Sequence, residues 1–272
     1  MNIFDRKLFQ ARTNKLPQNL LKEPNFLKEE ICNRNAEKLS ELKDNFEVGL
    51  ELSSGIGEFY KSLYVEGSEF YNPKKIGKLI QSDFSSNLLN NNPYPNKIEL
   101  DEENINLEAN SFDIVIANFA LHNINSPSAV FKNIYNILKP NGTFILTIPI
   151  SGTLEKLSEA LFEAEMKLFS GVSPRVHPFT DVKTLGNMVQ SAGFEQITVD
   201  KDKIEIMYKS FNKLFEDLRN SAQTNILSGR SKKYVGKNFF KEVENIYSKN
   251  IDAQSGCYPV IVEFANLIAW KP

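Results

Sequence analysis

The run Glu51-Leu52-Ser53-Ser54-Gly55-Ile56-Gly57 decides which fold this chain adopts. It completes an apolar, β-rich stretch at 46–52, which predicts a buried strand, and it leads into a helical pattern at 59–64. A glycine-containing turn lets the backbone approach a ligand closely, and the amides that begin the helix can receive a carboxylate. A pair of glycines is a weak signal, so Gly55 and Gly57 are compatible with a nucleotide site and with a tight turn that holds no ligand.

Strands and helices alternate on either side of this turn. Further strands are predicted at 76–82, 97–100, 112–118, 143–150, 196–208 and 260–270, and helices at 26–42, 127–138, 153–169 and 180–192. Residues 139–142 predict a turn, residues 170–179 a loop, and Thr180 and Gly193 the two ends of a helix. The alternation and the continuously apolar strands predict an α/β fold with a Rossmann-like, seven-stranded, mostly parallel sheet and helices on both faces.

The segment between the last two predicted strands is too long for a hairpin connection, so we expect a helical cap inserted near the active face. The chain then divides into an N-terminal helical segment at 1–45 and a nucleotide-binding α/β core at 46–150. Residues 151–272 form the rest of the same domain, with a substrate or partner loop, the helical insertion and the last two strands.

Composition excludes several classes of protein. The 272 residues carry a net charge of −2, which does not favour nucleic-acid binding, and no apolar run predicts a secretory signal or a membrane span. The two cysteines, Cys32 and Cys257, are far apart and predict reduced thiols in a cytoplasmic protein. Together with two separated histidines they predict no metal site.

Acidic residues at two strand ends strengthen the nucleotide interpretation. Asp83 ends the second predicted strand, near the offset of about 20 residues at which a carboxylate binds ribose hydroxyls in dinucleotide folds. Asp101 ends the third, where it could accept a hydrogen bond from an adenine amine. Each acid alone is more often a solvated residue. The turn at 51–57, Asp83 and Asp101 follow the first three predicted strands in order, however, and together they indicate a ligand site.

These motifs resemble the class I S-adenosylmethionine-dependent methyltransferases. The run 51–57 is similar to their Asp/Glu-x-Gly-x-Gly-x-Gly motif, Ser82-Asp83-Phe84-Ser85 to their ribose-binding strand end, and Leu138-Lys139-Pro140-Asn141-Gly142 to their Leu-Lys-Pro-Gly-Gly turn. The resemblance implies S-adenosylmethionine as the cofactor. It implies contacts to the cofactor from Glu51 (ammonium), Ser53, Gly55 and Gly57 (methionyl part), Asp83 and Phe84 (ribose), Asp101 and Glu102 (adenine) and Asn118 (sulfonium).

One position departs from the motif, because Ser53 stands where its first glycine is expected. Glycine adopts a positive φ without steric cost, whereas serine there needs an ordinary backbone geometry or strain of about 1–3 kcal/mol. A reduced affinity for the cofactor is the expected consequence.

A narrower resemblance extends over nearly the whole chain. Its motifs are Phe4-Asp5-Arg6, Gly171-Val172-Ser173-Pro174-Arg175, Pro178-Phe179, Ala192-Gly193-Phe194, Asp217-Leu218-Arg219 and Ala269-Trp270-Lys271-Pro272. They are similar to the methyltransferase-like assembly factors of respiratory complex I and their bacterial relatives, near the malonyl-acyl-carrier-protein methyltransferases of biotin synthesis. Eukaryotic members of this subgroup are associated with arginine hydroxylation in a complex I subunit, which makes such a subunit a candidate partner.

Two functions follow from these resemblances. The first is a methyltransferase whose acceptor, a small molecule, an acyl carrier or a protein, is unknown; methyl transfer needs mainly positioning of an already activated donor. The alternative is an S-adenosylmethionine-binding assembly factor that acts on a complex I subunit, in arginine hydroxylation. An internal non-haem iron site is not expected, since His122 and His177 have no His-x-Asp/Glu spacing. An NAD-dependent oxidoreductase is disfavoured, because the Gly-x-Gly-x-x-Gly pattern is absent.

Three further residues are candidates for the reaction itself. His122 follows the fourth predicted strand and is the candidate general base, although a histidine packed at the rim of the site fits the sequence as well. Arg175 and His177 lie in a proline-bounded loop, where they contact an anionic substrate or partner or simply order the loop.

Overall fold

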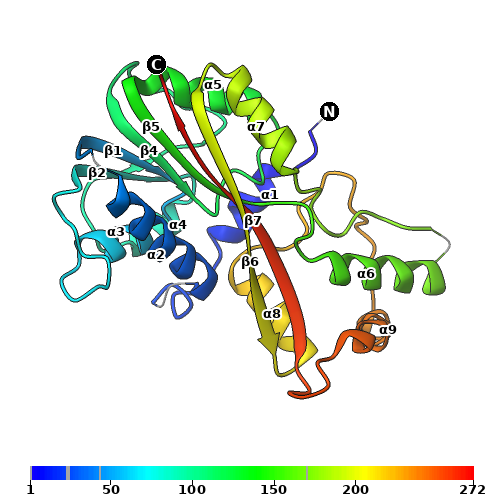
Figure 1. The fold of residues 1–272 in the computed structure, drawn as a ribbon. Coiled ribbons are helices and arrows are strands. Elements are labelled where there is room, and N and C mark those ends of the chain that lie inside the picture. Colours follow the sequence, from blue (N-terminus) through cyan, green and yellow to red (C-terminus); the bar gives the residue numbers. More distant parts are fainter. Residues whose placement is uncertain (1, 23–24, 43, 170) are drawn as a thin grey trace.

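A computed structural model describes residues 2–22, 25–42, 44–169 and 171–272, and its centre is one seven-stranded sheet (Figure 1). The strand order is β3-β2-β1-β4-β5-β7-β6. The strands are β1 (Phe46–Leu52), β2 (Ile76–Asp83), β3 (Lys97–Glu99), β4 (Phe112–Asn118), β5 (Leu138–Pro149), β6 (Glu195–Tyr208) and β7 (Tyr258–Trp270). All pairs are parallel except those that β7 makes with β5 and β6. The predicted fold class is confirmed.

Helices cover both faces of the sheet because its strands are apolar on both sides. One buried cluster joins the sheet to α5 (Pro127–Ile137) and α7 (Val182–Ser191), and another joins it to α2 (Phe26–Glu41) and α3 (Glu58–Tyr64). The short helix α4 (Ser86–Asn91) follows β2. Strand order reverses between β1 and β4, and ligands of such sheets bind beyond the carboxyl ends of the strands at this point.

The predicted helical cap surrounds the long outer ends of β6 and β7 (Figure 1). The insertion predicted between the last two strands forms α8 (Phe211–Asn220), α9 (Lys237–Tyr247) and the 3-10 turn η1 (Ser248–Asn250), and α6 (Glu155–Leu168), which precedes β6, packs with them to complete the cap. A hydrophobic cluster of its own, which includes Leu161, Phe211 and Phe239, holds these helices on the two strands. The cap therefore has a core separate from the two clusters at the centre of the sheet.

The structure corrects two predicted boundaries. Helix α7 is capped by Asp181 and not by Thr180, because the Asp181 carboxylate accepts a hydrogen bond from Thr184 N at 2.9 Å. The predicted turn at 139–142 is an irregular part of β5: Asn141 has a φ of 61°, and its N–H donates to Lys271 O at 2.9 Å. Pairing with the C-terminal residues keeps this segment in the sheet.

Two predictions touch residues outside the described part of the chain. The loop predicted at 170–179 begins at one of them, and residues 171–179 contain no helix or strand. The segment predicted as helical at 1–45 includes four others, and its described residues contain α1 (Arg6–Thr13) and α2. Within the described residues, none of the helices has the length and apolar character that crossing a membrane requires.

The N-terminus meets the cap region through two short segments that we call the clasp. Phe4 and Leu227 form an antiparallel bridge, and Asp5 N donates to Ile226 O at 2.8 Å. The Arg230 guanidinium pairs with the Asp5 carboxylate at 3.1 Å. Helix α1 begins directly after this bridge, so the clasp sets where the side chains of α1 lie.

Candidate active site

The turn after β1 has a backbone that only small residues tolerate. Gly55 and Gly57 have φ values of 63° and 93°. A Cβ on Gly55 would lie 2.5 Å from Lys28 Nζ, and one on Gly57 would lie 2.5 Å from the ring of Tyr94. The left-handed backbone and the close neighbours both require glycine at these two positions.

Ser53 shares this left-handed conformation, with a φ of 54°. The sequence left ordinary geometry and strain open at this position, and the structure has the strained geometry, which costs about 1–3 kcal/mol. The serine hydroxyl donates a hydrogen bond to the Glu102 carboxylate, a contact that glycine could not make. This bond offsets part of the strain and joins the turn to the segment after β3.

Two buried side chains stand at the ends of the neighbouring strands β1 and β4. Glu51 Oε1 accepts a hydrogen bond from Asn118 Nδ2 at 3.0 Å, and Asn35 donates to the Asn118 oxygen at 2.7 Å. Glu51 is fully buried, and within the described chain its Oε2 has no hydrogen-bond partner. Burial raises the pKa of Glu51 to about 8. The charge of Lys28 and the hydrogen bond from Asn118 act in the opposite direction but do not outweigh burial.

Asp83 connects the end of β2 to the glycine turn. One carboxylate oxygen accepts from Gly55 N at 3.0 Å, and the other accepts from Ser85 N at 2.9 Å. Burial raises the pKa of Asp83 to about 7, although these two hydrogen bonds act in the opposite direction. Asp83 is thus a buried acceptor at the position predicted for a ribose-binding carboxylate.

Helix α1 contributes a wall that the sequence did not assign to the site. The Arg6 guanidinium donates to Asp101 at 2.5 Å and to Glu102 at 2.7 Å, and it lies 5.3 Å from the centre of the Phe84 ring. The Phe9 ring packs against Phe84 with 5.0 Å between centroids. The motif Phe4-Asp5-Arg6 of the narrower resemblance is the one signal in the sequence that indicates this wall.

Lys28 of α2 is a second residue that the sequence analysis missed. Its Nζ donates to Ser53 O at 2.6 Å and lies 3.9 Å from the Glu58 carboxylate. Burial acts to lower the pKa of Lys28, but the nearby carboxylates, Glu58 first, outweigh it and raise the pKa. Lys28 therefore places a positive charge directly on the turn, where a ligand's carboxylate could bind.

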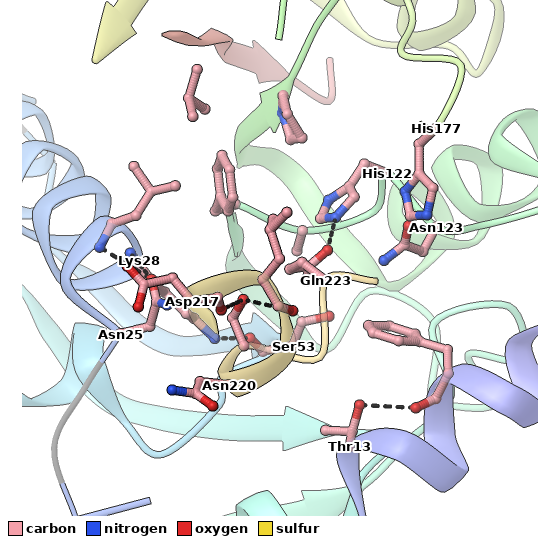
Figure 2. Close-up of a pocket in the computed structure, with 18 of the residues that line it drawn as sticks. Thr13, Asn25, Lys28, Ser53, His122, Asn123, His177, Asp217, Asn220 and Gln223 are labelled. Carbon is pink, nitrogen blue, oxygen red and sulfur yellow. Dashed lines mark hydrogen bonds between the residues drawn. The ribbon is translucent and has the colours of Figure 1, made fainter. Parts of the chain in front are cut away.

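One cavity of about 320 Å³ extends from this turn into the cap. Eight of the predicted site residues line it: Ser53, Gly55, Asp83, Phe84, Glu102, His122, Arg175 and His177. Glu51, Gly57, Asp101 and Asn118 lie behind this lining, and Asp101 is half exposed. Figure 2 shows Lys28 and Ser53 on one side of the cavity and the two histidines on the other.

The two histidines face the cavity from different elements. His122 Nε2 is hydrogen-bonded to Gln223 Oε1 at 3.0 Å (Figure 2), and its ring centroid lies 6.4 Å from that of His177. Burial lowers the pKa of both rings, that of His177 to about 4. Both imidazoles are therefore neutral at neutral pH, which is the form a proton acceptor needs.

Arg175 lines the cavity but is already paired. Its guanidinium donates to Glu165 Oε1 at 2.5 Å and 2.9 Å and lies 4.5 Å from the centre of the Phe239 ring. Ser173 N also donates to Glu165, at 2.6 Å. These contacts hold the loop 171–179 on α6 and the cap, which matches the loop-ordering interpretation of Arg175 more closely than an anion site. Over the described ranges, no group of three or more His, Cys, Asp or Glu side chains is placed to hold a metal ion.

Comparison with known proteins identifies the family of the chain. Residues 25–199 match the sequence model of the methyltransferase domain family. The chain belongs to this family. The methyltransferase is 31% identical over 278 residues to the mitochondrial arginine hydroxylase NDUFAF5 of Homo sapiens, which covers 100% of this chain and 77% of the relative. It is 29% identical to the malonyl-[acyl-carrier protein] O-methyltransferase of Gallionella capsiferriformans, over 63% of this chain and 57% of that one.

Solved structures show the same fold. The YcgJ protein of Bacillus subtilis covers 88% of this methyltransferase and 98% of its own chain, with a TM-score of 0.59 and 12% identity. A phosphoethanolamine N-methyltransferase of Haemonchus contortus, solved with S-adenosylmethionine, covers 88% and 52%, with a TM-score of 0.51 and 18% identity. Motifs, fold and family agree that this is a class I S-adenosylmethionine-dependent methyltransferase.

The residues of the turn fit this cofactor. Glu51 is a buried acid with an unpartnered oxygen, as an ammonium group nearby requires, and Asp83 is a buried acceptor suited to a diol. Gly55 lines the cavity, where its backbone can contact the methionyl part, and Lys28 supplies a charge for the methionyl carboxylate. S-adenosylmethionine supplies an activated methyl group, so the protein must hold donor and acceptor in line.

Proposed function

We propose that this methyltransferase modifies an arginine side chain of a partner protein by transferring a methyl group from S-adenosylmethionine. The likeness to the human arginine hydroxylase NDUFAF5 carries this proposal, because it covers 100% of the chain. It includes α8 and α9 of the cap, which lie beyond the 25–199 region of the general family match. The malonyl-[acyl-carrier protein] O-methyltransferase match covers only 63% of the chain, which supports a protein acceptor over an acyl carrier.

The roles proposed for the cofactor residues follow their positions. Asp83 would accept hydrogen bonds from the ribose hydroxyls, Glu51 would face the ammonium, and Phe84 would pack against the nucleoside. The backbone of Ser53, Gly55 and Gly57 would contact the methionyl part, Asp101 and Glu102 would lie beside adenine, and Asn118 would lie near the sulfonium.

His122 is the proposed proton acceptor of the reaction. It lines the cavity between the cofactor turn and the cap, and its neutral imidazole is held by Gln223. A guanidinium nitrogen that gains a methyl group must lose a proton, and a neutral histidine at the cavity wall can take it. His177, which is neutral beside it, would shape the apolar surroundings and keep a second charge away.

The name of the human relative favours a second candidate, hydroxylation of arginine. Hydroxylation inserts one oxygen atom into a C–H bond and therefore requires an oxidant in addition to the residues of this chain. The two reactions leave different products, since methylation adds carbon and hydrogen to the arginine and hydroxylation adds oxygen alone.

The resemblance to the complex I assembly factors makes a complex I subunit the proposed partner. The free thiols Cys32 and Cys257 support a cytoplasmic location.

Mass spectrometry of modified proteins tests the function. Extract from cells that lack this protein would be incubated with S-adenosylmethionine and either the wild type or Asp83→Asn, with Asp200→Asn as control, because Asp200 is an exposed acid outside the cavity. We expect one arginine-containing peptide to gain a methyl group with the wild type and the control, and not with Asp83→Asn. An arginine that gains oxygen would establish the second candidate, and modification that does not depend on Asp83 would contradict both.

A further inference from the structure

The cap end of the cavity is an apolar chamber. It is lined by aliphatic and aromatic side chains from α6, the loop 171–179, the two long strands and α8, namely Leu157, Leu161, Phe179, Ile206, Phe215 and Val262. Such walls suit the methylene stem of a long side chain, and they make any charge inside the chamber costly unless it is paired.

The chamber has few charged groups, and most of them are neutral or paired. Arg175 is neutralised by Glu165 at 2.5 Å, and His122 and His177 are held uncharged by burial. At the cofactor end, Glu102 is paired with Arg6 at 2.7 Å. The acid that remains in the cap part of the cavity, as far as the chain is described, is Asp217 of α8.

The Asp217 carboxylate contacts one exposed cation and the hydroxyl of one buried tyrosine. Lys213 Nζ lies 3.2 Å from one of its oxygens, and the Lys213 side chain is 52% exposed, against 23% for Asp217. On the inner side, Asp217 adjoins the buried Tyr208, whose pKa is raised by burial and by the charge of Asp217. The carboxylate is thus shared between an exposed lysine and the chamber.

Asp217 lies on α8 near an exposed part of the cavity wall. Asn220 lies three residues further on the same helix, lines the same cavity and is exposed, so the cavity opens beside it. In Figure 2 Asp217 and Asn220 both project from α8. Asp217 therefore lies about one helical turn from an exposed residue of the cavity wall.

We propose that Asp217 recognises the cation of the acceptor side chain, with the chamber walls holding its methylene stem. A carboxylate pairs with guanidinium through two parallel hydrogen bonds and with an ammonium through one, and the rings of Tyr208 and Phe179 suit either cation. The inference rests on the proposed function and adds the residue that selects the acceptor. Asp217 belongs to the motif Asp217-Leu218-Arg219, which the cofactor site does not use.

Calorimetric titration with three short peptides tests this role. The probes are acetyl-Gly-Arg-Gly-amide and its lysine and citrulline analogues, each added to the full chain saturated with S-adenosylhomocysteine. We expect the wild type to bind the arginine peptide and to show no measurable binding of the uncharged citrulline peptide. Asp217→Asn should weaken the affinity for the arginine peptide by about tenfold or more, because a hydrogen bond to a charged group is removed. Lys213→Ala, which frees the carboxylate, should bind the peptide as tightly as the wild type or more tightly.

Affinity for S-adenosylhomocysteine is the check on folding, and it should be unchanged in Asp217→Asn. Equal binding of the arginine peptide by the wild type and Asp217→Asn would overturn this inference and leave the proposed function standing. Binding of the lysine peptide alone, dependent on Asp217, would support the cation site and count against arginine as the acceptor. A wild type that binds none of the charged peptides would overturn the cation site.

Discussion

The two ends of the active-site cavity are held together by different kinds of interaction. At the cofactor end, a strained turn, buried acids and two basic residues form a polar network in which Ser53, Asp83 and Arg6 each have short contacts. At the cap end, apolar side chains from five elements surround neutral histidines and a paired arginine. Changes at the cofactor end should therefore alter affinity for the cofactor, whereas changes at the cap end should alter stability or acceptor binding.

The largest effect is expected from breaking the pair that holds the cap loop. Glu165→Ala would leave the half-buried Arg175 without its carboxylate and remove the acceptor of Ser173 N. We expect the free energy of unfolding to fall by about 3 kcal/mol, as when one partner of a buried ion pair is removed. Chemical denaturation measures this, and Glu163→Ala, an exposed position on the same helix, is the control that should change little. A large loss of cofactor affinity in Glu165→Ala would break the distinction between the two ends.

The next effect is on cofactor binding itself. Asp83→Asn removes the charge of a buried carboxylate that is proposed to accept both ribose hydroxyls. Affinity for S-adenosylhomocysteine should fall by about 2 kcal/mol, roughly thirtyfold, the range for hydrogen bonds to charged groups. Asp101→Asn, at a half-exposed acid, should lose less when both are compared by calorimetry. A greater loss of affinity in Asp101→Asn would indicate that the segment after β3, and not Asp83, makes the main contact with the nucleoside.

The buried acids also predict how stability, and with it cofactor binding, depends on pH. The pKa of Asp83 is about 7 in the folded protein and 3.8 as its ordinary value, so the folded state binds the proton more tightly than the unfolded state. Glu51, with a pKa of about 8 against 4.5, behaves in the same way. The stability that these two groups contribute to the ligand-free protein is therefore fully present below about pH 4, and this contribution is lost as the pH rises through 7 and 8.

The ligand has the opposite dependence, because ribose hydroxyls and an ammonium bind the ionised carboxylates. Affinity for S-adenosylhomocysteine should rise roughly tenfold between pH 6 and pH 8, with release of protons on binding. Titrations in buffers of different ionisation enthalpy measure both quantities, and Asp83→Asn should flatten the profile. Affinity that falls over this range would show that the acids are already ionised without the ligand.

The smallest effect concerns the strained turn. Ser53→Ala keeps the positive φ and loses the hydrogen bond to Glu102, whereas Ser53→Gly loses the bond and relieves the strain. We expect the glycine variant to be more stable than the alanine variant by about 1 kcal/mol in thermal denaturation. Equal stability of the two would mean that the turn relaxes without Ser53.

The sequence predicted the cofactor end better than the cap end, for a physical reason. Strands β1 and β4 have the predicted bounds because a short run of mainly apolar, β-prone residues is a local pattern. Parallel strands bring their carboxyl ends together, so Glu51, Asp83 and Asn118 could be placed before the structure was known. Helix ends were less predictable, since Asp181 took the capping position from its neighbour Thr180 through one side-chain hydrogen bond.

The residues that were missed depend on contacts between distant parts of the chain. Arg6 reaches Glu102 across 96 positions, and His122 reaches Gln223 across 101. Lys28 looks like an ordinary charged residue on the surface of an amphipathic helix, and only the packing of α2 against the turn gives it a role. Glu165 is similar, because its partner Arg175 lies in a loop whose path no local pattern indicates.

The clasp has a consequence for biosynthesis. It joins Phe4 to Leu227, and strands β1 to β6 lie between these two residues in the sequence. Closing so long a loop costs conformational entropy that is recovered only when both segments are present and packed. A nascent chain can form the turn at Ser53 well before α1 is held in place with Arg6 beside Glu102. The nucleoside wall of the site is therefore completed only after the segment that contains Leu227 has been synthesised.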